Sequence, residues 1–154
     1  MAVIRNRRQV GIKLDRIRRN SQAGVRQVLL RGAQAIQNTA VEGIINPPKT
    51  GRIYRSRGRR GARHQASAPG EYPAADTGRL HQSITATVAE RPDVLTVQVS
   101  ANVEYASYLE HGTSKMAPRP FLSRAYAENI GEIRRRARRA VKLGFLGRVG
   151  RWFT

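Results

Sequence analysis

The first third of the chain carries apolar residues at the spacing of one face of a helix. Their separations are close to multiples of about 3.6 residues. They are Val10, Leu14, Ile17, Val25, Val28, Ile36 and Ile44. The pattern predicts a long amphipathic helix that extends to about residue 45, where Asn46 and the two prolines behind it end the helix. Its outward face is basic, with Arg16, Arg18, Arg19, Arg26 and Arg31.

Two short segments further along alternate apolar and polar residues with the period of a half-buried strand. They are residues 83–89 and 94–100, and Arg91, Pro92 and Asp93 supply the turn between them. This arrangement predicts an antiparallel hairpin. Because a lone hairpin is marginal in water, it must pack on the long helix or join a sheet.

Helical patterns resume after the hairpin. Residues 103–111 form about two helical turns that Gly112 ends in a left-handed conformation. Pro118 and Pro120 suit the first turn of a second long helix. The predicted inward stripe of this helix is Phe121, Leu122, Ala125, Ile133, Ala137 and Val141, and its other face carries Arg134, Arg135, Arg136, Arg138, Arg139 and Lys142. We therefore expect an α+β fold in a single domain, residues 1–154, which is an ordinary domain length.

Residues 46–78 are interrupted by prolines and glycines and predict a long irregular loop. Asp76 or Thr77 is expected to cap a short turn that follows it. A loop this long is usually functional or disordered, so we expect it to be mobile alone and ordered by a neighbour. Its candidate contact residues are Arg52, Arg55, Arg57, Arg59, Arg60 and Arg63. We also expect a flexible tail, residues 143–154, in which Trp152 and Phe153 either dock into a partner or pack on the chain's own core.

The chain has 29 Lys and Arg residues against 10 acids, a net charge of +19. Such a surplus has three readings: a solvated basic face, contact with acidic neighbouring subunits, or contact with nucleic acid. The aromatic residues that interleave with basic ones in single-strand-binding platforms are missing, and no groove-reading motif is present. Any DNA contact is therefore predicted to be non-specific.

Candidate catalytic residues are few. Cysteine is absent, which excludes disulfides and cysteine-bound zinc, and the three histidines are too far apart in sequence for a compact ligand pattern. Glu110 and His111 are adjacent, but neighbouring residues on a helix point in different directions, so we interpret them as a helix-end carboxylate and an exposed imidazole. We expect no enzyme, no metal and no cofactor. Metal-dependent cleavage of a substrate that is lost on changing either residue would instead indicate an enzyme.

The sequence shows no apolar run long enough for a signal peptide or a membrane span. We therefore expect a protein that is made in the cytoplasm and has no membrane partner.

Two blocks carry a family resemblance. The first contains Ser67-Ala-Pro-Gly-Glu71, Pro73-Ala74, Thr77-Gly-Arg-Leu80 and Ser83-Ile84, and the second contains Tyr105-Ala106, Tyr108-Leu-Glu110, Gly112-Thr113 and Arg119-Pro-Phe-Leu122. In this order they resemble the small tail-completion and head-to-tail joining (neck) proteins of lambdoid long-tailed phages, which include minor tail proteins of the Z type. One departure is His111, where that family more often has an aromatic residue before Gly-Thr.

The resemblance implies a structural virion protein that forms a ring at the neck, completes the tail and joins it to the DNA-filled head. Implied partners are further copies of the chain, in a ring of roughly six or twelve, together with the neck adaptor or stopper, the tail terminator and the tail tube. A tail-terminator or head-closure role and a basic, non-sequence-specific DNA-binding protein are the alternatives. The predicted subunit or partner interface comprises Tyr105, Tyr108, Leu109, Glu110, Gly112, Thr113, Arg119, Pro120, Phe121, Trp152 and Phe153.

Overall fold

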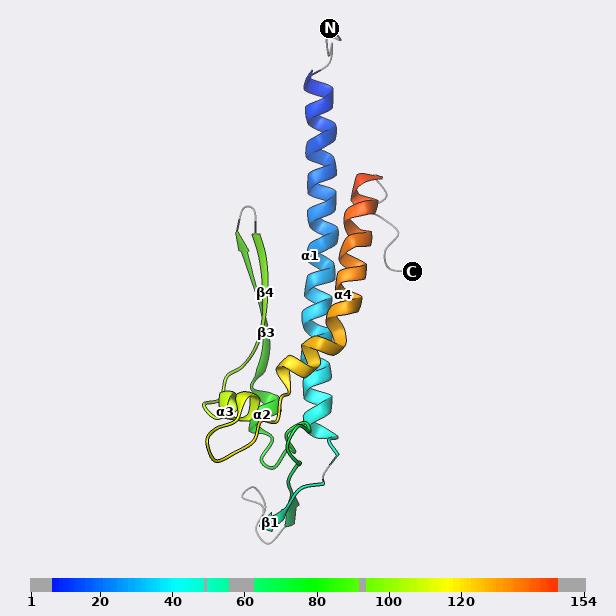
Figure 1. Ribbon diagram of the computed structural model, residues 1–154. Coiled ribbons are helices and arrows are strands. Elements are labelled where there is room, and N and C mark those ends of the chain that lie inside the picture. The colour runs from blue at the N-terminus through cyan, green and yellow to red at the C-terminus, as the bar shows by residue number, and fades with distance from the viewer. Residues whose placement is uncertain (1–6, 49, 56–62, 92–93, 147–154) are drawn as a thin grey trace. The chain divides into compact units, whose positions relative to one another are not determined.

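The computed structural model (Figure 1) describes residues 7–48, 50–55, 63–91 and 94–146, with side chains from residue 15 onwards except those of residues 90 and 91. The elements are α1 (Arg7–Ile45), β1 (Ile53–Arg55), β2 (Arg63–Gln65), α2 (Arg79–Gln82), β3 (Ile84–Arg91), β4 (Val94–Ala101), α3 (Ala106–His111) and α4 (Leu122–Phe145). The predicted α+β class is confirmed. The chain divides into two compact units, here named the helical unit (residues 1–31 and 131–154) and the mixed unit (residues 32–130).

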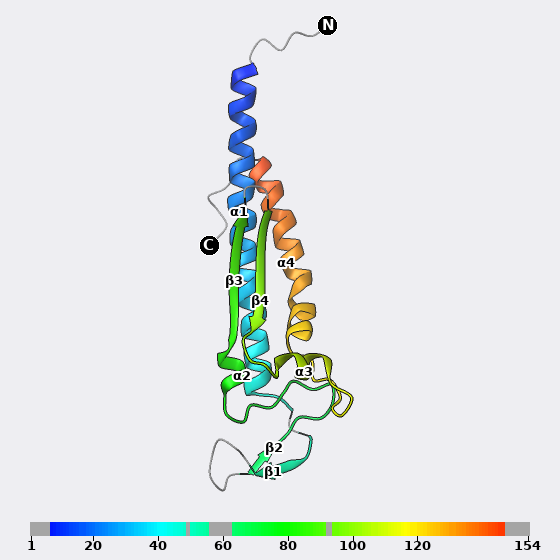
Figure 2. The same ribbon diagram turned by 90° about the vertical axis from the view of Figure 1, so that its left-hand side faces the viewer.

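In the helical unit the first part of α1 and the last part of α4 run antiparallel and lie side by side in both views (Figures 1 and 2). The contact is made by small residues: a Cβ on Gly24 would lie 3.5 Å from the Cβ of Ala140, and Gly144 lies against Ser21. Ala140 is almost fully buried, whereas Val141, which was predicted to point inward, is 40% exposed. The prediction for Val141 was wrong because the close approach of the two helices requires a small side chain at the contact.

The core of the mixed unit is built on one stripe of α1. Ala33, Ile36, Ala40 and Ile44 recur at helical spacing and are all buried, so the predicted apolar face is confirmed at Ile36 and Ile44. The side chains that cover this stripe come from later segments: Tyr72, Leu80, Ile84, Ala106, Phe121 and Ala125 are also buried. Phe121 and Ile44 are the largest side chains among the described residues to be fully buried.

The predicted hairpin is also confirmed. Strands β3 and β4 pair antiparallel along their whole length, from Ile84 opposite Ala101 to Arg91 opposite Val94 (Figure 2). Of the predicted turn, Arg91 is the last residue of β3, and Pro92 and Asp93 lie outside the described residues. Gln37 of α1 donates a hydrogen bond to the carbonyl of Ile84 at 2.7 Å, which attaches the base of the hairpin to the core helix.

Three local predictions are corrected. The segment 46–78 is not wholly irregular, because Ile53–Arg55 and Arg63–Gln65 pair as a small antiparallel sheet in which Tyr54 faces His64. Helix α2 begins after Gly78, which has a φ of 82°, and no side chain caps it, so neither Asp76 nor Thr77 has the expected role. Helix α4 begins at Leu122 rather than at the prolines and ends at Phe145, beyond the predicted start of the tail.

Candidate functional site

The junction between α3 and α4 is formed by one carboxylate. Glu110, near the end of α3, accepts hydrogen bonds from the backbone N–H groups of Phe121 at 2.9 Å, Leu122 at 3.0 Å and Ser123 at 2.9 Å. These N–H groups open α4 and have no partner inside the helix, and a negative charge is favoured at that end of a helix. Glu110 therefore fixes α3 against the beginning of α4.

Burial alone raises the pKa of the Glu110 carboxyl, but hydrogen bonds from Ser123 and from the backbone of Phe121 and Leu122 outweigh it and lower the pKa below 4.5. The carboxylate is thus ionised at neutral pH. Its oxygens are occupied by the helix end, and His111 beside it is exposed. This geometry agrees with the interpretation of Glu110 as a helix-end carboxylate.

The turn after α3 depends on Gly112. Its φ of 75° lies in the left-handed region that favours glycine, and a Cβ there would lie 2.7 Å from the carbonyl oxygen of Met116. The turn is closed by mutual backbone hydrogen bonds between Thr113 and Met116, and the backbone N–H of Arg119 donates to the carbonyl of Leu109 at 2.7 Å. The glycine of the second block is therefore required by the backbone conformation, whereas the bonds of Thr113 to Met116 use backbone groups that most residues supply.

The two sequence blocks meet in space through residues that are about 50 positions apart in the chain. The backbone N–H of Gly70 donates to the carbonyl of Pro118 at 3.0 Å, and the guanidinium of Arg119 donates to the carbonyl of Ser67 at 3.1 Å. Glu71 stiffens the first block, because its carboxylate accepts hydrogen bonds from the Thr50 hydroxyl at 2.6 Å and from the backbone N–H of Ala68 at 2.7 Å. The hydrogen bond from Thr50 is the main cause that lowers the pKa of Glu71. The two blocks thus form one folded joint.

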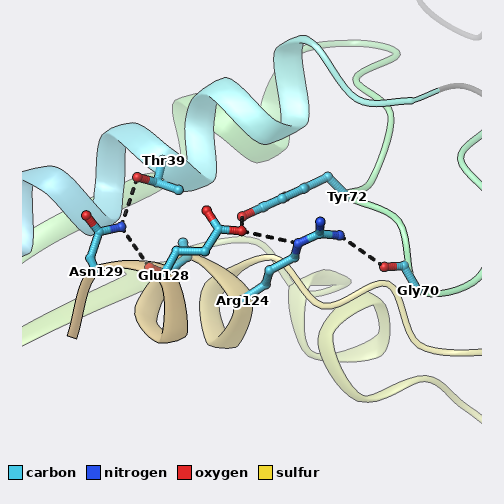
Figure 3. A network of polar contacts seen from close by, with 7 residues as sticks. Thr39, Gly70, Tyr72, Arg124, Glu128 and Asn129 are labelled. Atoms are coloured by element: carbon cyan, nitrogen blue, oxygen red, sulfur yellow. Dashed lines mark hydrogen bonds and ion pairs between the residues drawn. The ribbon is translucent and has the colours of Figure 1, made fainter. Parts of the chain in front are cut away.

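A buried tyrosine connects this joint to the core (Figure 3). Tyr72 is 7% exposed, its hydroxyl donates to the Glu128 carboxylate at 3.3 Å, and the guanidinium of Arg124 lies 4.7 Å from the centre of its ring. Arg124 also donates to the carbonyl of Gly70 in the first block at 3.4 Å. Burial, followed by the neighbouring Glu128 charge, raises the pKa of Tyr72 to about 12.

One turn further along α4, the side-chain amide of Asn129 donates to Thr39 of α1 at 2.9 Å and to the carbonyl of Ala125 at 2.9 Å (Figure 3). The hydrogen bond from Asn129 to Thr39 links α4 to α1 beside the contacts of Tyr72.

A groove of about 570 Å³ opens beside the joint. Aromatic and aliphatic side chains from both blocks line it, among them Tyr105, Leu109 and Met116, and Arg119 and His81 supply polar groups. Next to it, His64 is buried, with its Nδ1 4.0 Å from a carboxylate oxygen of Asp76. The groove therefore has a lining of both apolar and polar side chains.

The predicted interface residues divide into exposed and supporting ones. Tyr108 is 57% exposed and Tyr105 is 37% exposed, whereas Phe121 is fully buried and supports the joint from beneath. Thr113 is exposed, and Leu109, Glu110, Gly112, Arg119 and Pro120 are half-buried. Arg52, Arg55 and Arg63 lie exposed on the β1–β2 hairpin. Arg57, Arg59, Arg60, Trp152 and Phe153 lie outside the described residues.

Sequence reasoning did not find the network of Tyr72, Arg124 and Glu128. The signal that was present is the position of Tyr72 inside the first block, between Glu71 and Pro73. The described ranges contain no group of three or more acidic or histidine side chains that could hold a metal ion. In these ranges no helix is both long and apolar enough to cross a membrane.

Residues 9–112 match the model of a family named for bacteriophage HK97 gp10, a proposed tail component. The match covers more than half of the chain and includes α1 from its third residue on, the first block and α3. The chain belongs to the HK97-gp10-like family. Among curated proteins and solved structures, no significant match was found.

Membership of the HK97-gp10-like family indicates a structural component of the phage tail or neck, located in the virion and in contact with other tail or neck proteins. The predicted tail or neck class is supported at this level. The narrower resemblance to minor tail proteins of the Z type stays a prediction. The match ends at Gly112, so the turn and helix start that complete the joint in this chain lie beyond it.

Proposed function

We propose that this HK97-gp10-like protein is the subunit of a closed homo-oligomeric ring at the phage neck, where it completes the tail and joins it to the DNA-filled head. The observation that carries the proposal is the presentation of Tyr105, immediately before α3, and of Tyr108 on α3. Both are exposed, yet α3 is held against α4 by Glu110 and the Gly112 turn. Aromatic side chains on a rigid support are typical anchors of protein interfaces.

The β3–β4 hairpin supplies a second surface in the mixed unit. Within the described ranges these strands pair only with each other, so each has an open edge, and Val88 and Val94 are 37% and 56% exposed. Open strand edges pair readily with another chain. A ring interface is heterologous, which means that one surface of a subunit meets a different surface of the next. The tyrosines of α3 and the hairpin edge provide two such different surfaces.

The balance of charge also favours the mixed unit for self-contact. Residues 32–130 contain 12 Lys and Arg residues and eight acids, so the unit is only modestly basic. Two copies can therefore approach through it with far less repulsion than through the helical unit. The neck adaptor, the tail terminator and the tail tube are the proposed partners above and below the ring.

The test compares two exposed tyrosines of the same unit. Tyr108 on α3 and Tyr126 on α4 are 57% and 48% exposed. Native mass spectrometry of the wild type should find a closed oligomer, and Tyr108→Ala should weaken its assembly by about tenfold or more, as expected for an interface anchor. Tyr126→Ala should assemble like the wild type. A wild-type protein that stays monomeric at every concentration, or two variants that behave alike, would contradict the proposal.

The role in the particle is tested by removing the protein from the phage. Electron microscopy should then find filled heads and separate tails of normal length. Tails of uncontrolled length would favour the tail-terminator role instead, and heads that have lost their DNA would favour head closure.

A further inference from the structure

The positive charge of the chain is concentrated in the helical unit. Residues 1–31 and 131–154 hold 17 Lys and Arg residues and two acids, Asp15 and Glu132. Of the net charge of +19, this unit of 55 residues therefore carries +15. The mixed unit, although it is larger, carries only +4.

The basic residues of α4 are arranged against the rules for a stable solvated helix. Arg134 and Arg138, Arg135 and Arg139, and Arg138 and Lys142 are like-charged pairs four residues apart, and all five side chains are exposed. Such pairs destabilise a helix, whereas opposite charges at this spacing stabilise it. Glu132 is the one acid between residues 131 and 154, and it pairs with Arg135 and with Arg136. A helix that only faced water would gain from more acids here, so the pattern indicates an anionic partner.

The packing of the helical unit places exposed cations of both helices within one small body. Gly24 of α1 lies against Ala140 of α4, and Gly144 lies against Ser21, so the two backbones approach closely. The exposed Arg16, Arg18, Arg19, Arg26 and Arg31 of α1 therefore lie on the same small unit as the arginines of α4.

We propose that the helical unit binds the phosphate backbone of duplex DNA without sequence preference. Duplex DNA presents one negative charge for about every 1.7 Å of its axis, so about 25 Å of duplex balances 15 positive charges. The part of α1 that belongs to this unit, from Arg7 to Arg31, spans about 36 Å at 1.5 Å per residue, so a duplex lying along it presents enough phosphate charge to balance the unit. Of the 17 basic residues of the unit, 15 are arginines, whose fork of N–H donors matches phosphate oxygens.

An acidic protein surface fits these observations less well. It would need about 15 unpaired carboxylates within the same length, and their mutual repulsion would destabilise that surface before binding. DNA already carries this charge density and gains free energy by releasing condensed counterions. The inference does not require the protein to form a ring.

The experiment measures the binding of the full-length protein to two fluorescent duplexes of about 25 base pairs and unrelated sequence at several salt concentrations. Both duplexes should bind alike, with an affinity that falls linearly on logarithmic axes as salt rises. Replacing Arg138 and Arg139 by Gln removes two phosphate contacts and should lower the salt slope by about two. The matched control replaces Arg52 and Arg55 of the mixed unit by Gln, which removes the same charge, and it should leave the slope unchanged.

Three outcomes would overturn the proposal. The first is no binding to either duplex at moderate salt, and the second is an equal loss of salt slope in both double variants. The third is competition by polyglutamate as strong as competition by unlabelled DNA at equal charge, which would assign the surface to an acidic protein. Because Gln is a good helix former and the sites are exposed, both variants should fold, and circular dichroism checks this. Repeating the titration with Tyr108→Ala separates DNA binding from ring assembly, since the slope per subunit should persist when the ring does not form.

Discussion

Glu110 and Phe121 are joined by a hydrogen bond of 2.9 Å from the backbone N–H of Phe121 to the Glu110 carboxylate. The bond spans 11 residues and links the end of α3 to the beginning of α4. Phe121 is fully buried in the core, while Tyr108, two residues before Glu110, is exposed. A single side chain thus connects the core of the mixed unit to the surface proposed for subunit contact.

Replacing Glu110 by Ala should lower the free energy of unfolding by about 1–2 kcal/mol, because three backbone N–H groups of α4 lose their acceptor. Glu110→Gln keeps an acceptor oxygen without the charge and should cost less. Chemical denaturation of each variant measures the effect. Glu104→Gln, at an exposed position just before α3, is the control and should leave the stability unchanged.

The same bond predicts a pH dependence. The pKa of Glu110 is lowered in the folded state, so its contribution is present above 4.5 and is lost as the pH falls through the folded-state pKa. The stability difference between the wild type and Glu110→Gln should therefore shrink below pH 4.5. A difference that stays constant between neutral and strongly acidic pH would contradict the capping role.

Much of the fold could be predicted because it depends on local pattern. The apolar stripe of α1, the alternation in β3 and β4 and the glycine stop at Gly112 each follow from the residues within a few positions. The inward face of α4 was predicted less well, because Val141 has the right spacing but Ala140 has the right size for the contact with Gly24. The side-chain size that fits at a helix contact depends on the partner helix. The periodicity of one helix carries no information about that partner.

Replacing Gly112 by Ala should destabilise the protein more than replacing Gly70 by Ala. Both glycines have a positive φ, 75° and 80°, so both changes place Ala in a disfavoured conformation, at about 1–2 kcal/mol. At Gly112 the new Cβ would also lie 2.7 Å from the Met116 carbonyl oxygen, whereas no atom lies within 4 Å of the Cβ position at Gly70. Thermal unfolding measures both. Equal losses would mean that the turn relaxes and that the contact with Met116 does not require glycine.

Tyr72 should titrate with a pKa of about 12, and ultraviolet difference spectroscopy of the wild type and Tyr72→Phe identifies its transition. Its pKa is raised on folding from 10, so its contribution to stability is present below pH 10 and is lost as the pH rises toward 12. Tyr72→Phe should also lower the free energy of unfolding by about 1 kcal/mol at neutral pH, because the bond to Glu128 is lost. Tyr126→Phe, at an exposed site, is the matched control. If removing Tyr72 leaves the transition near pH 12 in place, the assignment is wrong.

The candidate site was predictable only in part, for a related reason. The two blocks were recognised by their order, but the bonds that join them, from the backbone N–H of Gly70 to Pro118 and from the guanidinium of Arg119 to Ser67, both end on backbone carbonyls. Backbone donors and acceptors are the same at every residue, so the sequence does not indicate which pairs will meet. Tyr72, Arg124 and Glu128 were missed because their contacts depend on how the segment before α2, which carries Tyr72, packs against α4.

At the contact between α1 and α4 in the helical unit, two glycine-to-alanine changes should have opposite effects on stability. Gly24→Ala places a Cβ 3.5 Å from that of Ala140, an ordinary van der Waals contact, and replaces glycine by a better helix former, so the free energy of unfolding should rise by up to about 1 kcal/mol. Gly144→Ala gains the same propensity, but its Cβ would overlap the Ser21 hydroxyl and lie 2.7 Å from the Ser21 Cα. Because backbone atoms cannot move aside cheaply, this change should destabilise the protein by about 1–3 kcal/mol.

Adding Ser21→Gly to Gly144→Ala leaves the Cα of residue 21 in place and should restore only part of the lost stability. Chemical denaturation of the three variants measures the differences, and a Gly144→Ala protein as stable as Gly24→Ala would mean that α1 and α4 do not pack through these residues.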